Sequence, residues 1–362
     1  MSSCYLTFHE HTEEGDLVTA TRIWTDLDLD PTSDCRQQGY LRLPISSNES
    51  GAGWLPIPIV VFKNGEGPSV LLQAGNHGDE FDGQVMLIKL IRELKLEDVS
   101  GRIYILPGVN APAVKAGGRL SPLDGGNLNR SFPGDPNGTP TPMIAHFLET
   151  VILPKVDHVF DFHSGGASSE FIPMAHTALS SDPQKRRQVL EFFQVFGMEN
   201  SSAVEGLIGG DLRFLGACAR AGVTHMSTEL GGAAVVSPDV LEAAEHGVRR
   251  LLHHLGVVRR PLTDVPAPAT RFWRRLPQRD YVFSSAVGIF EPIARLGQEV
   301  HAGDLAARIH STDHPWDAPT EIRFAVDRTV LAQRTLARCE IGDYLYALGV
   351  PADVGQLRQQ RS

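Results

Sequence analysis

The feature that most constrains this chain is a short glycine-bounded stretch between two segments of different periodicity. Residues 70–74 form an apolar run typical of a buried strand, and residues from about 82 to 96 repeat apolar side chains at helical spacing. Between them lies Gly75-Asn76-His77-Gly78-Asp79-Glu80, whose glycines allow a tight strand-to-helix turn. His77 and Glu80 are therefore predicted on one side of that turn, and imidazole with carboxylate is a common pair of metal ligands.

Strands and helices alternate beyond this turn, which is typical of an α/β domain. An apolar strand is predicted at 102–106, after Gly101, and further strands at 156–162 and 223–228. Helices are predicted at about 142–153, 183–196, 212–221 and 238–255. We expect one α/β domain over residues 39–258, preceded by an N-terminal extension, 1–38, in which residues 17–24 alternate like an edge strand.

A second region is predicted after a proline-rich linker at residues 259–272. Short β-rich runs replace the helical periodicity, and a Gly-Asp turn followed by an apolar run occurs at 303–309 and again at 342–348. This repeat predicts a small all-β barrel or sandwich over residues 273–350, as in biotinyl and lipoyl carriers, with a tail at 351–362. The last lysine of the chain is Lys185, so this β domain cannot carry a prosthetic group on lysine and is expected to be structural or to shape the site.

The charge balance favours a small-molecule partner over a nucleic acid. Lys and Arg number 33 against 43 Asp and Glu, a formal net charge of -10, whereas binding to a phosphate backbone needs dense cations. No apolar run approaches the roughly 18 residues that span a bilayer, and the N-terminus lacks a basic segment followed by an apolar one. We therefore expect no membrane association and a cytoplasmic location.

Four cysteines, Cys4, Cys35, Cys218 and Cys339, are scattered without CxxC spacing. This pattern indicates neither a disulfide framework nor a thiolate metal site. Cys218 lies in a run of small residues and is expected to be a buried helical thiol rather than a nucleophile.

A third metal ligand is predicted at the end of another strand, because a catalytic zinc site uses three protein ligands and leaves a fourth position to water. His163 ends the apolar strand at 156–162 and is followed by Ser164-Gly165-Gly166. A histidine at a strand end is more often an ordinary polar residue, but the presence of His77 and Glu80 favours the ligand interpretation. His225 is either a core histidine or a partner of a ligand.

Glu229 is the candidate general base. It follows the strand predicted at 223–228 and precedes Leu230-Gly231-Gly232, so its carboxylate is expected at a buried strand end, where a charge is costly without a role. A base there would take a proton from the attacking water and later deliver it to the leaving amine. The alternative is a structural salt bridge.

A glycine- and proline-rich segment at 111–140 is predicted to be a long, ordered loop that carries substrate contacts. Asn129 and Arg130 offer an amide and a planar fork suited to a carboxylate, and Arg119 could stabilise an oxyanion. Arg213 is a weaker candidate for substrate binding, for which a surface role is favoured. The alternative is that the whole segment is a surface loop without a function.

Four motifs together resemble the succinylglutamate desuccinylase/aspartoacylase family, relatives of the zinc carboxypeptidases. They are Gly-Asn-His-Gly-Asp-Glu at 75–80, Asn-Leu-Asn-Arg at 127–130, Asp-Phe-His-Ser-Gly-Gly at 161–166 and Ser-Thr-Glu-Leu-Gly-Gly at 227–232. The resemblance covers about residues 39–258, and the region after 281 resembles the family's C-terminal domain. It implies a zinc-carboxypeptidase-like mixed sheet flanked by helices and one Zn²⁺ per chain. The implied site residues are His77, Glu80 and His163 for the metal, Glu229 for catalysis, and Asn129, Arg130 and Arg119 for the substrate.

Within the family, residues 39–44 and 124–134 resemble most the members that deacetylate N-α-acetyl-L-2,4-diaminobutyrate in ectoine breakdown. Two stretches depart from those members, Phe81-Asp82-Gly83 after the turn and residues 209–214. The implied activity is hydrolysis of a linear amide, which removes a small acyl group from an N-acylated amino acid. Acetyl is the leading candidate for this acyl group. A peptide carboxypeptidase, an aspartoacylase-like or desuccinylase-like enzyme and a catalytically idle binding scaffold are the alternatives. A homo-oligomer is compatible with each of them.

Overall fold

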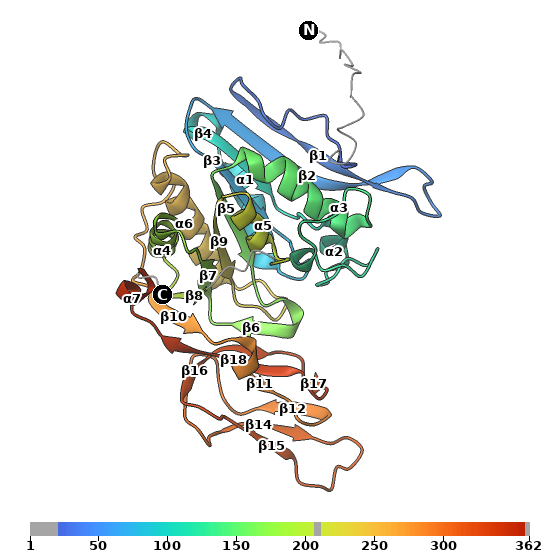
Figure 1. Ribbon diagram of the computed structural model, residues 1–362, viewed down its shortest axis with the longest axis vertical. Helices are drawn as coiled ribbons and strands as arrows, with labels where there is room; N and C mark the ends of the chain where they lie inside the picture. Colours follow the sequence, from blue (N-terminus) through green and yellow to red (C-terminus); the bar gives the residue numbers. More distant parts are fainter. Residues whose placement is uncertain (1–20, 206–210, 359–362) are drawn as a thin grey trace.

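The computed structural model describes residues 21–205 and 211–358, which form an α/β region and a β-rich region (Figure 1). Half of the edge strand predicted at 17–24 lies outside these residues, and within the described half Trp24 forms an isolated antiparallel bridge to Arg42. The divergent stretch at 209–214 is described only from Asp211 onward. No helix in the described ranges is both long enough and apolar enough to cross a membrane.

A mixed sheet of 14 strands runs through both regions. The strands of its α/β part are β1 (Cys35–Ile45), β2 (Gly53–Asn64), β3 (Ser69–Ala74), β4 (Gly101–Leu106), β5 (His158–His163), β6 (Ser169–Phe171), β7 (Met174–Leu179), β8 (Asn200–Glu205) and β9 (Thr224–Glu229). Their order is β1-β2-β4-β3-β5-β9-β7-β8, with β6 paired elsewhere. Strands β4, β3, β5 and β9 are parallel. Strand β2 is antiparallel to β1 and β4, and β7 is antiparallel to β9 but parallel to β8. The expected mixed α/β sheet is therefore confirmed.

Helices cover both faces of this sheet. They are α1 (Phe81–Glu93), α2 (Ala111–Ala116), α3 (Pro140–Phe147), α4 (Pro183–Phe196), α5 (Phe214–Arg220), α6 (Pro238–His254) and α7 (Val354–Arg358). Shorter helical turns occur at Leu96–Asp98, Leu128–Arg130, Leu148–Ile152, Leu153–Lys155, Gly166–Ser168 and Gln278–Asp280. Helices α1, α4 and α6 pack on one face, and α3 and α5 pack on the other.

The two-sided core explains why the central strands read as continuous apolar runs. Side chains along a strand alternate between faces, so Val70 and Leu72 of β3 join one core and Leu71 joins the other. In β5, Phe160 and Val159 divide in the same way. Both faces of the sheet are thus buried against helices.

Three parallel strands end at one edge of the sheet, and this edge carries the predicted ligands. In the β3–β5 pair Ala74 lies opposite Phe162, and in the β5–β9 pair His163 lies opposite Glu229. The turn with His77 and Glu80 directly follows β3. Segments far apart in the sequence therefore meet at the carboxyl ends of β3, β5 and β9, as ligand sites in open α/β sheets commonly do.

Several predicted boundaries need correction. The segment at 111–140 is not a continuous loop, because α2 and the turn Leu128–Arg130 lie within it. The helix predicted at 142–153 starts at Pro140 and ends as α3 at Phe147, where a wider π-type turn, Leu148–Ile152, continues it. Helix α1 ends at Glu93 rather than near residue 96, because Leu94 adopts an extended conformation.

The β-rich region is a sandwich. Its strands are β10 (Arg271–Arg275), β11 (Val282–Phe283), β12 (Gly288–Pro292), β13 (Glu299–Val300), β14 (Leu305–His310), β15 (Thr320–Arg323), β16 (Arg328–Arg334), β17 (Arg338–Cys339) and β18 (Tyr344–Pro351). Strands β15-β14-β12-β17 form a separate four-stranded sheet. Phe290 of this sheet packs with Leu345, Tyr346 and Leu348 of β18 in one core.

The two regions share backbone hydrogen bonds, which the sequence pattern did not indicate. Strand β10 pairs in parallel with β8 and antiparallel with β18, so the large sheet continues from one region into the other. Strand β6, from the α/β region, pairs with β16. Figure 1 shows β6, β10 and β18 together at this junction. Residues 259–270, which connect the regions along the chain, contain neither helix nor strand.

Replacing Gly83 with alanine tests how closely α1 packs on the ligand-bearing strands. A Cβ at Gly83 would lie 2.6 Å from Cβ of Phe162 and 2.9 Å from its carbonyl oxygen, so α1 must move away from β5. Although alanine favours helices, we expect Gly83→Ala to lower the free energy of unfolding by roughly 1–3 kcal/mol, measured by urea denaturation.

Gly51→Ala is the matched control, because a Cβ at this exposed turn would have no neighbour within 4 Å. It should leave the unfolding midpoint unchanged. Equal stability of the two variants would show that α1 has room to spare and that the packing argument is wrong.

Candidate active site

A cavity of about 560 Å³ lies at the carboxyl ends of β3, β5 and β9. All of the site residues predicted from the sequence line it: His77, Glu80, Arg119, Asn129, Arg130, His163, Arg213 and Glu229. These residues come from the turn after β3, the segment between α2 and α3, the ends of β5 and β9, and the start of α5. The fold thus brings the whole candidate set around one space.

Two glycines give the turn after β3 its path, each for a different reason. Gly75 has a φ of 72°, in the left-handed region that residues with a Cβ rarely adopt. Gly78 lies against α2, where a Cβ would come within 2.0 Å of the Ala113 carbonyl oxygen. The N–H of Gly78 donates to the Gly118 carbonyl oxygen at 2.9 Å, so the turn is also tied to the residue before Arg119.

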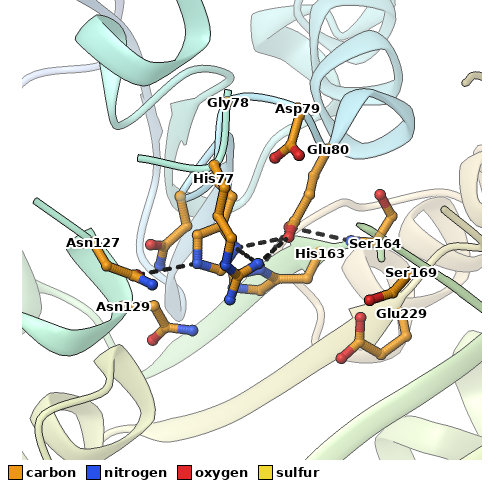
Figure 2. A network of polar contacts seen from close by, with 12 residues as sticks. His77, Gly78, Asp79, Glu80, Asn127, Asn129, His163, Ser164, Ser169 and Glu229 are labelled. Atoms are coloured by element: carbon orange, nitrogen blue, oxygen red, sulfur yellow. Dashed lines mark hydrogen bonds and ion pairs between the residues drawn. The ribbon is translucent and has the colours of Figure 1, made fainter. Parts of the chain in front are cut away.

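Three buried side chains converge on one point of the cavity (Figure 2). The Glu80 carboxylate places Oε1 2.7 Å from Nδ1 of His77 and Oε2 2.7 Å from Nδ1 of His163. One ligand atom from each residue lies within 4.8 Å of the other two. Imidazole nitrogens and a carboxylate oxygen at this spacing can hold a metal ion. We call these three residues the ligand cluster.

Each of the two histidine rings is oriented by a contact at its second nitrogen, Nε2, so that Nδ1 faces Glu80. Nε2 of His77 lies 3.2 Å from Oδ1 of Asn127, and Nε2 of His163 lies 2.8 Å from Oδ2 of Asp161. Both oxygens only accept hydrogen bonds, so each Nε2 carries a hydrogen. The Glu80 oxygens at the Nδ1 atoms also only accept, so each Nδ1 either carries a proton of its own or presents a lone pair to a cation that lies between it and Glu80. The chemistry of this donor set fits a metal ion bound through two Nδ1 atoms and one carboxylate.

The charges in the ligand cluster favour a cation. Burial raises the pKa of Glu80, but His77 and His163 outweigh it and hold this pKa well below its ordinary value. Burial lowers the pKa of His163, and here Asp161 and Glu80 outweigh it, so this pKa lies well above its ordinary value. The two buried carboxylates therefore attract either a proton on His163 or a metal ion in its place.

Asp79 connects the two segments that carry the ligands. Its Oδ2 accepts from the N–H of Ala167 at 2.8 Å, in the loop after β5. In the same loop the N–H of Ser164 donates to Oε2 of Glu80 at 3.2 Å. These bonds fix the turn after β3 relative to the end of β5, so the distance between the ligands does not depend on the ligand side chains alone.

Glu229 lies at the end of β9, next to the ligand cluster (Figure 2). Its side chain is 15% exposed. Burial raises the pKa of Glu229 to about 7, although Arg275, whose Nη1 lies 3.9 Å from Oε1, opposes the rise. A carboxyl group with a pKa near neutrality can take up a proton and release it again, as a general base and acid must.

Asn129 is held in place by α5, and Nη1 of Arg130 donates to the Asn129 carbonyl oxygen at 2.6 Å. Oδ1 of Asn129 accepts from the N–H of Phe214 at 3.0 Å, so the NH₂ group of Asn129 remains available as a donor. Within residues 21–205 and 211–358, no carboxylate forms an ion pair with Arg130. Burial, together with the nearby Arg119 and Arg213, lowers the pKa of Arg130, although Asp211 opposes this. A bound carboxylate would relieve this repulsion.

The other two predicted arginines already have carboxylate partners. Nη1 of Arg119 lies 3.6 Å from Oε1 of Glu80, directly beside the ligand cluster. Nε of Arg213 donates to both carboxylate oxygens of Asp211, at 2.8 and 2.9 Å. Asp211 thus accounts for the charge of Arg213 without a substrate, whereas Arg119 is placed to act on the reacting group.

The predicted set lacked the residues that orient the ligand histidines. Asp161 precedes His163 by two residues in β5, and the period of two along a strand could have located it on the same face. Asn127 lies two residues before Asn129, in a motif read only for its substrate contacts. His225, one of whose two suggested roles was a ligand partner, places its Nδ1 3.2 Å from the hydroxyl of Thr177.

The β-rich region also contributes residues to the cavity that no sequence signal indicated. Arg275 and Tyr281 line it, as do Gln278 and Tyr344. They lie in short strands and turns without a motif, and the junction of the two regions alone brings them to the site. The cavity is therefore a product of both regions.

Comparisons with known proteins agree with this geometry. Residues 66–255 match the model of a succinylglutamate desuccinylase/aspartoacylase catalytic domain. The N-alpha-acetyl-L-2,4-diaminobutyric acid deacetylase of Halomonas elongata is 40% identical over 316 residues, which cover 87% of this chain and 92% of that protein.

Solved structures give the same result. A succinylglutamate desuccinylase/aspartoacylase from Rhodobacter sphaeroides is 38% identical with a TM-score of 0.85, covering 92% of this chain and 100% of that one. The product-bound structure of the ectoine utilization protein EutE (DoeB) from Ruegeria pomeroyi is 35% identical with a TM-score of 0.85, covering 91% of this chain and 99% of that one.

Metal content tests the ligand cluster. We expect one divalent metal ion per chain after dialysis, measured by inductively coupled plasma mass spectrometry, and loss of that ion in His163→Ala and Glu80→Ala. Asp161→Asn should weaken metal affinity by roughly 10- to 100-fold, because it no longer orients the His163 ring as a carboxylate does. His176→Ala, which changes a cavity histidine outside the cluster, should keep the ion. Stoichiometric metal in His163→Ala would refute the assignment.

The raised pKa of Glu229 predicts a pH-dependent difference in stability between the metal-free protein and Glu229→Gln. Because the folded pKa, about 7, exceeds the ordinary 4.5, folding favours the protonated form. Relative to the Gln variant, the unchanged protein should lose stability between about pH 4.5 and pH 7, and the difference should level off above that range. The total change should approach about 3 kcal/mol, measured by urea denaturation at several pH values. A difference that does not vary with pH would contradict the burial argument.

Proposed function

This chain belongs to the succinylglutamate desuccinylase/aspartoacylase family, and we propose that it is a zinc-dependent deacetylase of N-α-acetyl-L-2,4-diaminobutyrate. The coarser activity follows from its relatives: it is a hydrolase that acts on the amide bond of an N-acylated amino acid. The finer assignment is supported above all by the 40% identical relative, which is named as a deacetylase of this substrate. The relative from Ruegeria pomeroyi, named for ectoine utilization, supports the same assignment.

Zinc is proposed because the donors of the ligand cluster, two imidazole nitrogens and a carboxylate, are those it prefers. His77, Glu80 and His163 would hold it. A zinc ion supplies a Lewis acid that polarises the amide carbonyl and makes a water molecule easier to deprotonate. Asn127 and Asp161 keep the two imidazole rings in the orientation that leaves Nδ1 free for this role.

Glu229 moves the proton in the proposed reaction. Its carboxylate takes a proton from water as the water oxygen attacks the carbonyl carbon of the acetyl group. Glu229 then gives this proton to the α-nitrogen as the C–N bond breaks, which yields acetate and the free amino acid. Arg119, beside the ligand cluster, stabilises the negative charge that develops on the carbonyl oxygen.

Arg130 and Asn129 are proposed to hold the α-carboxylate. Arg119 and Arg213 each form an ion pair with a carboxylate of the protein, and Arg130 alone among these three forms no ion pair within the described ranges. The guanidinium of Arg130 and the free NH₂ group of Asn129 can together bind one carboxylate. One unpaired cation suits a substrate with a single carboxylate better than a dicarboxylic one.

His176 provides a feature that suits an amine in the substrate side chain. Its Nδ1 lies 3.2 Å from the Ser202 carbonyl oxygen and must carry the hydrogen, which leaves Nε2 as an acceptor. Burial, followed by the charge of Arg275, lowers the pKa of His176 to about 3, so the ring is neutral. A neutral acceptor in the cavity tolerates an ammonium group that a charged imidazole would repel.

The test is turnover of a substrate panel by the zinc-loaded protein. We expect acetate release from N-α-acetyl-L-2,4-diaminobutyrate to exceed that from N-acetylaspartate, N-succinylglutamate and peptides with a free C-terminus. Glu229→Gln should lower kcat by roughly 10²- to 10⁴-fold. Arg130→Gln should raise KM, and Lys115→Gln, which removes an exposed cation of α2, should not. Release of C-terminal residues from peptides without cleavage of acetyl amino acids would replace the proposal with a carboxypeptidase.

A further inference from the structure

We propose that Arg275 is a positioning residue that holds the Glu229 carboxylate at its working place, an inference that rests on the proposed function. Arg275 ends β10 in the β-rich region and lies outside the matched catalytic domain, residues 66–255. Its side chain reaches the cavity at the junction of the two regions. The β-rich region would thereby supply part of the catalytic apparatus, not only a wall of the cavity.

Glu229 has little else to orient it. Across residues 21–205 and 211–358, no hydrogen bond joins its carboxylate to another side chain or to the backbone, and its polar contact is the approach of Oε1 to Nη1 of Arg275 at 3.9 Å. A glutamate side chain has three rotatable bonds and populates several rotamers in an open cavity. The charge of Arg275 selects those that keep the carboxylate on the Arg275 side of the cavity, near the end of β5.

Arg275 itself is held on several sides. Its Nε donates to the hydroxyl oxygen of Tyr281 at 2.6 Å. Its guanidinium carbon lies 5.2 Å from the ring centre of Phe171 and 5.7 Å from that of Tyr281, within the range of cation–π attraction. Phe171 belongs to β6, which pairs with β16, so residues from both regions surround the guanidinium. A side chain fixed in this way can transmit its position to Glu229.

The pairing also distinguishes Arg275 from a substrate-binding arginine. The charge of Arg275 is matched by Glu229, and its Nε is used by Tyr281. Arg130, by contrast, has no carboxylate partner within the described ranges. Loss of Arg275 should therefore disturb the catalytic step while substrate binding is preserved.

The separation between an effect on catalysis and an effect on substrate binding can be tested by kinetics. The zinc-loaded variants are measured with the best substrate of the panel. We expect Arg275→Gln to lower kcat by roughly 30- to 100-fold, the effect of a carboxylate misplaced by about 1 Å, with KM changed by less than about twofold. Tyr281→Phe keeps the ring and removes the hydroxyl, so it should lower kcat by only about fivefold, as for one hydrogen bond. Arg274→Gln, which removes the exposed arginine one residue earlier in β10, is the control and should match the unchanged protein.

A double-mutant comparison shows whether Arg275 acts through Glu229. In the residual activity of Glu229→Gln, the added change Arg275→Gln should have less than about a twofold effect. An undiminished effect in that background, or a rise in KM with kcat preserved, would show that Arg275 contacts the substrate and would overturn the proposal.

Guanidinium rescue keeps the proposal testable if Arg275→Gln folds poorly. Arg275→Ala should regain activity when guanidinium ion is added at sub-denaturing concentration, while Arg130→Ala under the same conditions keeps its high KM. No gain in Arg275→Ala would count against the positioning role. If the unchanged protein hydrolyses no N-acyl amino acid, the proposed function fails; if it does and Arg275→Gln is fully active, only the present inference fails.

Discussion

The site depends on one buried carboxylate, that of Glu80, shared between two imidazole rings. A buried negative charge is costly unless it is matched, and the structure matches it through the Nδ1 atoms of His77 and His163. Each ring is in turn held from behind, by Asn127 or Asp161. Removing any member leaves either an unmatched charge or a ring free to rotate. The parallel strands and the tight turn therefore serve mainly to bring these groups to one point.

The arginines around this cluster differ in whether a carboxylate of the protein pairs with them. Arg119 faces Glu80, Arg213 faces Asp211 and Arg275 faces Glu229, so three charges are already compensated within the protein. Arg130 is left without such a partner in the described ranges, and this difference sets the place where an anionic part of a substrate is most strongly attracted. The cavity can therefore contain several cations and still select for one carboxylate.

Much of the α/β region and its site could be predicted from the sequence because both rest on local signals. Apolar runs and helical periodicity located the strands and helices, and His77, His163 and Glu229 each stand at a strand end that the pattern marks. Boundaries were less accurate, since the π-type turn after α3 and the early end of α1 depend on packing. Arg275 could not be predicted, because its role arises from pairing between β8 and β10, which are separated by α5, β9 and α6. No local pattern reports such a contact.

The pairing of β10 with β8 limits how far the sequence of the β-rich region can change without affecting the site. Successive side chains of a strand point to opposite faces, and here Arg274 is exposed while Arg275 reaches the cavity. A shift of β10 by a single residue against β8 that moves Arg275 into the place of Arg274 would turn Arg275 to solvent and put Leu276 in its place. Length changes between α6 and β10 can be absorbed by the irregular residues 259–270, whereas those within β10 cannot. The β-rich region therefore cannot be replaced by another domain without regard to its pairing with the α/β region. The position of Arg275 depends on the register between β8 and β10 as much as on the identity of the residue.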